Sequence, residues 1–172
     1  MKGLCVDLPY PSVSSLCADL SAARTIAPAY ASISGELSAL LSYVYYAFYF
    51  EKEGMEEYAK TLSAIAICEM GHFRLLGQTL LRLGIDPIYT AIPPHFTQFY
   101  TTAELSYFKR PQQMLLDSIS GEMQAIAEYK NMQKRLKNED VSALLARITL
   151  DEQLHLETLN GLYQTLTEND NR

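Results

Sequence analysis

Apolar residues recur at spacings of three and four along most of the chain, a period typical of α-helices that bury one face. The pattern predicts an all-α fold with four long helices, over about residues 30–53, 56–83 and 111–137 and from Asp140 to about Thr167. Gly54 and Gly84 mark the ends of the first two helices, and Pro111 suits the first turn of the third. The tight turn at Gly54 predicts that the first two helices form an antiparallel hairpin.

Two segments lack a long helical period. Residues 1–28 contain three prolines and one modest helical stretch, Ser14–Arg24, and we expect this extension to pack across the helices without contributing chemistry. Residues 84–110 contain Pro87, Pro93 and Pro94 among several aromatic residues, and their length fits a crossover that runs along a bundle. The expected organisation is therefore an N-terminal extension, 1–28, followed by a four-helix bundle, 29–172.

A repeated motif divides the helical part into two similar halves. Ile33-Ser34-Gly35-Glu36 recurs as Ile119-Ser120-Gly121-Glu122, and each copy has an alanine three residues after the glutamate and a tyrosine seven after it. A Glu-x-x-His motif follows each copy, at Glu69–His72 and at Glu152–His155. The chain is thus predicted to contain two versions of one helical hairpin.

The spacing of these residues indicates a site for two metal ions. Residues i and i+3 share one face of a helix, so the glutamate and histidine of each Glu-x-x-His motif can approach one ion. All four glutamates fall on apolar stripes, where unpaired carboxylates would have to take up protons or open the fold. Two divalent cations would balance the four charges. The alternative, a solvated charged face, is disfavoured by the apolar neighbours and by the duplication.

With one glutamate from each of two helices and Glu-x-x-His from each of the other two, residues 29–167 resemble the ferritin-like superfamily, which includes rubrerythrins, bacterioferritins and manganese catalases. The resemblance implies a ferritin-like four-helix bundle, two hairpins joined by a long crossover, with two iron or two manganese ions per chain. It implies that Glu69 and Glu152 bridge the ions. The remaining ligands would be Glu36 with His72 on one ion and Glu122 with His155 on the other.

Other residues near these motifs have open roles. Tyr43 and Tyr129 lie two turns after Glu36 and Glu122, so they are either hydrogen-bond donors or radical relays at the site, or core tyrosines with a polar tip. Cys68 points away from the ligand face and is expected to be a buried free thiol. His95, in the crossover, is expected to be a loop residue and not a ligand.

The predicted function is a di-iron or di-manganese oxidoreductase that acts on peroxide or dioxygen, with an electron donor that the sequence does not identify. The alternatives are a non-catalytic iron-binding or iron-storage protein and a structural protein that binds zinc or one metal. The chain lacks the paired cysteines of a rubredoxin-like domain, and Ala125 stands where rubrerythrins have a further glutamate. The few residues after the last helix argue against a closed storage cage.

Charge and composition narrow the expected partners. A formal charge of −6 argues against nucleic acid or an anionic membrane as a partner. Three cysteines, an odd number without a C-x-x-C pair, favour a reducing, cytoplasmic location. Residues 43–50 are apolar or aromatic around the whole helix, which predicts a homodimer or larger homo-oligomer. The competing explanation is that residues 1–28 or 84–110 cover Tyr45, Tyr46 and Tyr49 within one chain.

Overall fold

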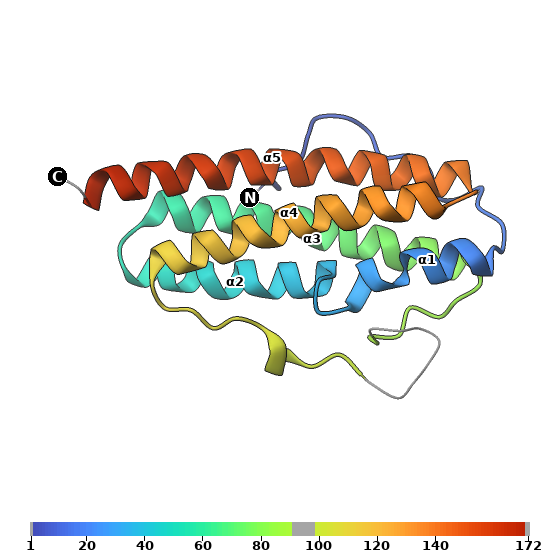
Figure 1. The fold of residues 1–172 in the computed structure, drawn as a ribbon, viewed down its shortest axis with the longest axis horizontal. Helices are drawn as coiled ribbons and strands as arrows, with labels where there is room; N and C mark the ends of the chain where they lie inside the picture. The colour runs from blue at the N-terminus through green and yellow to red at the C-terminus, as the bar shows by residue number, and fades with distance from the viewer. Residues whose placement is uncertain (1, 91–98, 171–172) are drawn as a thin grey trace.

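Four helical positions lie side by side in a bundle (Figure 1). Three are occupied by α3 (Glu56–Leu83), α4 (Pro111–Arg135) and α5 (Glu139–Asp170), and the fourth by α1 (Leu20–Ala31) followed end to end by α2 (Glu36–Lys52). α2 packs chiefly against α3, and α4 chiefly against α5. The predicted all-α bundle of two hairpins is therefore confirmed. The computed structural model describes residues 2–90 and 99–170, and within them the only β pairing is an isolated bridge between Thr90 and Phe99.

The ends of most helices lie where the turn residues predict them. Gly54 and Gly84, with φ of 73° and 94°, end α2 and α3 in the left-handed conformation that favours glycine. Pro111 is the first residue of α4. At the start of α5 the side chain of Asn138 accepts a hydrogen bond from the backbone N–H of Val141 at 3.1 Å.

The first helical position differs from the prediction, because the expected helix 30–53 is interrupted. α1 ends at Ala31 and α2 begins at Glu36. Serine and glycine, which make up most of the four intervening residues, are weak helix formers, and a Cβ on Gly35 would lie only 2.8 Å from the carbonyl oxygens of Pro28 and Ala29. The helix expected at Ser14–Arg24 begins only at Leu20, after the Asp19 cap, so the predicted segment boundary at residue 28 falls inside α1.

The crossover between α3 and α4 covers part of the aromatic face of α2. The hydroxyl of Tyr46 donates to the Ser106 carbonyl at 3.2 Å, and the rings of Tyr45 and Tyr107 lie 5.0 Å apart, edge to face. This internal cover was one of the two explanations that the sequence left open. Phe48, however, remains 61% exposed on the outer side of α2. His95 lies outside the described residues.

No helix in the described part of the chain combines the length and the apolar character needed to cross a membrane.

The N-terminal segment, residues 2–19, runs along α3 and α5 in an extended conformation. The Leu4 N–H donates to the Ala64 carbonyl at 2.9 Å, and Cys5 forms a disulfide with Cys68 of α3. The prediction of a free thiol at Cys68 is therefore wrong. The two cysteines are 63 residues apart, so no local spacing pattern in the sequence indicates that they pair. Cys17 is the free cysteine, so the count of three no longer argues for a reducing compartment.

The core consists of two apolar clusters, one toward each end of the bundle. One cluster joins α1 to the C-terminal half of α3, and the other joins α2 to the N-terminal half of α3. α4 and α5 contribute to both clusters. Between the two clusters, near the middle of the bundle, the helices bury polar side chains, which include four glutamates and two histidines.

Candidate metal centre

The six residues predicted as metal ligands meet in this polar middle zone. Glu36 is the first residue of α2, Glu69 and His72 lie in α3, Glu122 in α4, and Glu152 and His155 in α5. Each is at most 4% exposed. Packing in the two apolar clusters therefore fixes the positions of the helices along the bundle axis, so that these side chains face one another.

The ligand-type atoms form two overlapping groups. One contains Glu36, Glu69, His72 and Glu152, and the other contains Glu69, Glu122, Glu152 and His155. Within each group the chosen nitrogen and oxygen atoms all lie within 4.8 Å of one another. Glu69 and Glu152 belong to both groups, while Glu36 and Glu122 each belong to one.

The shared glutamates present one oxygen to each histidine. The Nδ1 atom of His72 lies 3.0 Å from Glu69 Oε2 and 3.2 Å from Glu152 Oε1. The Nδ1 atom of His155 lies 3.0 Å from Glu69 Oε1 and 3.3 Å from Glu152 Oε2. Each of these two carboxylates thus spans the centre in the manner of a bridging ligand.

The polar atoms of the centre fit divalent cations better than they fit one another. Four of them are buried without a hydrogen-bond partner: Glu36 Oε2, Glu69 Oε1, Glu152 Oε1 and His155 Nδ1. Leaving buried polar atoms unpaired costs about 1–3 kcal/mol each. Oxygen and imidazole nitrogen donors that converge in this way are the ligand set of carboxylate-bridged iron and manganese.

Crowding of like charges perturbs the acids of the centre. Burial, and then the nearby charges of Glu69 and Glu152, raise the pKa of Glu36 well above its usual range, and the pKa of Glu122 is raised in the same way. Burial opposes the ionisation of Glu69 too, but His155 and His72 lower its pKa well below the ordinary value. Without metal, protons must therefore hold the centre together, and bound cations would replace them.

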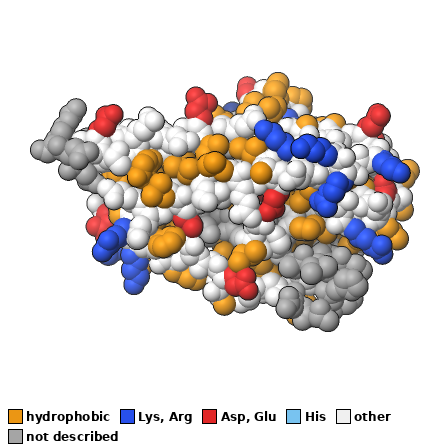
Figure 2. Space-filling view, viewed as in Figure 1, with side chains coloured by type: hydrophobic (Ala, Val, Ile, Leu, Met, Phe, Trp, Pro, Cys, Tyr) orange, Lys and Arg blue, Asp and Glu red, His pale blue; other side chains and the backbone are white. Residues whose placement is uncertain are grey.

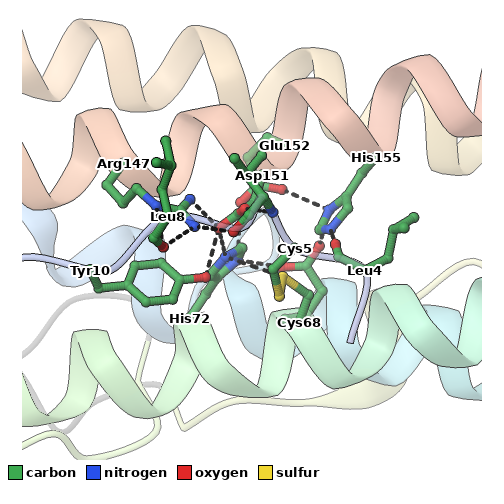
Figure 3. The surroundings of a disulfide bond; sticks show 12 residues. Leu4, Cys5, Leu8, Tyr10, Cys68, His72, Arg147, Asp151, Glu152 and His155 are labelled. Atoms are coloured by element: carbon green, nitrogen blue, oxygen red, sulfur yellow. Dashed lines mark hydrogen bonds and ion pairs between the residues drawn. A yellow bond between two sulfur atoms is a disulfide. The ribbon is translucent and has the colours of Figure 1, made fainter. Parts of the chain in front are cut away.

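Outer hydrogen bonds orient both histidines (Figure 3). His72 Nε2 lies 3.0 Å from Asp151 Oδ2, and His155 Nε2 lies 2.8 Å from the Leu4 carbonyl oxygen. With Nε2 as the donor in each pair, Nδ1 faces the glutamates and would offer a lone pair to a metal ion once its own proton is lost. The tautomers suited to metal binding are thus set by one carboxylate and by the N-terminal segment.

Asp151 is held by several further groups. Its carboxylate accepts hydrogen bonds from Tyr10 Oη at 2.6 Å and from the Val6 N–H at 2.7 Å, and Arg147 Nη1 lies 2.8 Å away. Burial opposes its ionisation, but His72, Tyr10 and Arg147 lower the pKa of Asp151 far below its usual range. Neither Asp151 nor the N-terminal segment was predicted from the sequence to belong to the centre. The available signal was an acid beside Glu152 with an arginine one turn earlier on the same face.

Tyr43 and Tyr129 both lie at the centre and contact it crosswise. The Tyr43 hydroxyl of α2 donates to Glu122 Oε1 of α4, and the Tyr129 hydroxyl of α4 donates to Glu36 Oε1 of α2. Burial and the neighbouring glutamates raise the pKa of both phenols well above the ordinary value. The two tyrosines therefore stay protonated and orient the two unshared glutamates.

A cavity of about 330 Å³ leads to the centre between α2, α4 and the crossover. Its walls include Gly35, Ser38, Gly121 and Ala125, and all four glutamates of the centre reach it. Figure 2 views the molecule from the side of α2 and α4, where the surface is hollowed near the middle. Small side chains around a polar floor leave room for a small substrate.

Comparison with known proteins points to one family. A family model described as "Ferritin-like domain" matches residues 30–169. A manganese catalase from Anabaena shares 21% sequence identity, with a TM-score of 0.78 over 94% of this chain and 80% of that chain. A bacterioferritin from Rhodobacter capsulatus, whose structure has a metal-free dinuclear site and haem iron, shares 19% identity, with a TM-score of 0.74 over 89% of each chain. No curated protein sequence matches the chain.

Proposed function

This chain belongs to the ferritin-like domain family, and we propose that it binds two iron or two manganese ions and acts as an oxidoreductase on peroxide or dioxygen. The observation that carries the proposal is the pair of overlapping carboxylate and histidine groups, whose buried atoms lack hydrogen-bond partners. A metal pair held there would supply reversible two-electron redox chemistry for peroxide or dioxygen.

Each protein residue then has a distinct role. Glu69 and Glu152 would bind both ions, Glu36 and His72 would complete one, and Glu122 and His155 the other. This partition follows the two groups of the centre and the oxygen atoms that the shared glutamates present to each histidine.

The cavity and the outer hydrogen bonds support a catalytic role. Tyr43 and Tyr129 donate hydrogen bonds to the unshared glutamates and hold them in place beside the cavity. Asp151 and the Leu4 carbonyl keep the histidines in one orientation. The cavity is large enough to admit peroxide or dioxygen.

The donor set favours iron or manganese over zinc. The four carboxylates outnumber the two imidazoles, and neither of the two overlapping groups contains a cysteine. Zinc in structural sites is commonly bound by sulfur and nitrogen in a tetrahedron, whereas carboxylates suit manganese and non-haem iron.

The second candidate function is iron storage. The fold likeness to the bacterioferritin supports it, since that likeness covers equal shares of both chains. The number of ions per chain separates the two functions, because an enzyme needs two and a storage assembly takes up many more.

Metal-loaded protein provides the test. Elemental analysis should give two ions per chain after loading with iron or manganese, and loaded protein should consume peroxide or dioxygen faster than metal-free protein. Uptake of many ions per chain without turnover would instead establish storage. Binding of zinc alone, with no turnover in the iron and manganese forms, would contradict both.

A further inference from the structure

The Cys5–Cys68 disulfide lies beside His72 of the centre, and the proposed function has no use for it (Figure 3). Cys68 directly precedes Glu69, and its Sγ lies 3.6 Å from Nε2 of His72. The other nitrogen of His72, Nδ1, faces Glu69 and Glu152. A single imidazole ring thus separates the sulfur from the position that a metal ion would occupy.

The two cysteines differ in exposure. Cys68 is 1% exposed, whereas Cys5 has intermediate exposure in the N-terminal segment that lies over the helices. Cys5 is therefore the cysteine at which thiol exchange from outside would begin, with Cys68 as the leaving thiol. The sequence of groups from solvent to the centre is Cys5, then Cys68, then His72.

The chain around Cys5 is held in place without the disulfide. The residue before it, Leu4, uses its N–H on Ala64 and its carbonyl on His155. The residue after it, Val6, uses its N–H on Asp151, and its carbonyl accepts from Arg147 Nη2 at 2.7 Å. Cys5 therefore stays beside Cys68 when the S–S bond is open, so the pair can close again without a search through the unfolded chain.

We propose that Cys5 and Cys68 form a dithiol–disulfide couple that supplies two electrons to the metal centre through His72, which makes the protein a thiol-dependent peroxidase. The proposal rests on the proposed function. The two thiols lose two electrons and two protons and form the S–S bond. Peroxide takes up the two electrons and two protons and becomes two water molecules. A dithiol from outside then reduces the disulfide by exchange at Cys5 and is itself oxidised to a disulfide.

The decisive measurement is the rate at which the disulfide re-forms. Full-length protein with Cys17→Ser is used, because that change removes the exposed third thiol and leaves the couple intact. The protein is reduced with dithiothreitol, freed of reductant without air, and prepared metal-free, iron- or manganese-loaded, and zinc-loaded. One equivalent of peroxide is added, and thiols are alkylated at intervals and counted by mass spectrometry.

We expect the iron or manganese form to re-form the disulfide at least about tenfold faster than the metal-free form, because a buried thiol reacts poorly with peroxide directly. The zinc form should match the metal-free form, since zinc occupies oxygen and imidazole ligands but transfers no electrons. Equal rates in all three forms would overturn the couple and leave the disulfide as a staple of the N-terminal segment.

A second measurement tests the dithiol–disulfide couple separately from the proposed oxidoreductase function. Peroxide reduction driven by dithiothreitol should be lost in loaded Cys5→Ser protein and retained in loaded Cys17→Ser protein. If loaded protein consumes peroxide while both thiols stay reduced, the couple is wrong and the proposed function stands. If loaded protein consumes no peroxide at all, the proposed function has failed and the couple fails with it.

Discussion

The run Ile-Ser-Gly-Glu occurs in both hairpins, but it lies at a helix break in one and within a continuous helix in the other. Gly35 packs against two carbonyl oxygens where α1 meets α2, whereas a Cβ on Gly121 in α4 would meet no atom within 4 Å. Glu36 and Glu122 are nevertheless 3% and 4% exposed, and each accepts a hydrogen bond from a tyrosine of the other hairpin. The position of each glutamate is therefore fixed by packing across the bundle and not by its local backbone.

The two histidines show a second difference between the halves. His72 donates to a side chain, Asp151, but His155 donates to the backbone of Leu4. Cys68 precedes Glu69 as Asp151 precedes Glu152, and its sulfur is bonded to Cys5 beside Leu4. The N-terminal segment thus provides for His155 what a carboxylate provides for His72.

Removing a shared glutamate should have the largest effect on the centre. Glu69→Ala or Glu152→Ala should lose both ions, because each carboxylate faces both histidines, while Glu36→Ala or Glu122→Ala should lose chiefly one. Elemental analysis of the four variants measures this. Their metal-free forms should stay folded, because none of the four glutamates belongs to the two apolar clusters of the core. Equal metal loss from all four would contradict the bridging assignment.

Asp151→Ala should weaken metal binding by about 10–100-fold, the usual effect of removing an outer partner of a histidine ligand. The loss should fall on the ion held by His72, so a metal titration should show one weakened step and one nearly unchanged step. Tyr10→Phe is the matched control, because it removes one donor to Asp151 and leaves the carboxylate on His72. Equal weakening of both steps would mean that the two histidines are not held independently.

The two glycines should respond to alanine in opposite directions. Gly35→Ala should lower the free energy of unfolding by about 1–3 kcal/mol, because the new methyl group overlaps the Pro28 and Ala29 carbonyl oxygens. Gly121→Ala should raise it by about 0.5–1 kcal/mol, because alanine is the better helix former in open space. Denaturant unfolding of the metal-free variants gives both values. Similar losses for both would show that the break at Gly35 is not required.

The stability of metal-free protein should fall as the pH rises above about 6.5, the ordinary value for histidine. Burial opposes the charge on His72, but Glu152 and Glu36 raise its pKa well above 6.5, and the pKa of His155 is raised likewise. The folded chain then binds more protons than the unfolded chain, so this stability is complete below pH 6.5 and is lost through the raised pKa. Thermal unfolding across pH 6–9 tests this, and metal-loaded protein should lack the decline.

The outer faces of the hairpins should differ in self-association. The α1–α2 side exposes the apolar side chains of Ile33, Val44 and Phe48, and we expect a homodimer or larger assembly through this side. Phe48→Glu should dissociate the assembly, while Met123→Glu, at an equally exposed position on α4, should not. Light scattering at micromolar concentration measures both, and a monomer near 19.4 kDa for the unchanged chain would refute the assembly.

The sequence predicted the bundle because helical period and turn glycines are local signals. The sequence also predicted which six residues lie close together, because the duplicated motif shows which helix each residue lies on and that each faces the core. It did not reveal the break before Glu36, because Ile-Ser-Gly-Glu has no strong conformational preference and its neighbours decide. The disulfide, Asp151 and the Leu4 carbonyl were missed because they depend on an extended segment whose partners lie far along the chain.

The contacts of that segment set the order in which the protein can be completed. Leu4 and His155 are 151 residues apart, and Val6 and Asp151 are 145 apart. During synthesis, residues 4–10 leave the ribosome long before α5. Leu4 can pair with Ala64 of α3 first, whereas His155 and Asp151 are absent until α5 has been made. Such distant pairings close late in folding. Metal loading should therefore follow synthesis of the whole chain, and a nascent chain that stops before α5 would present an unfinished centre to the metal ions of the cell.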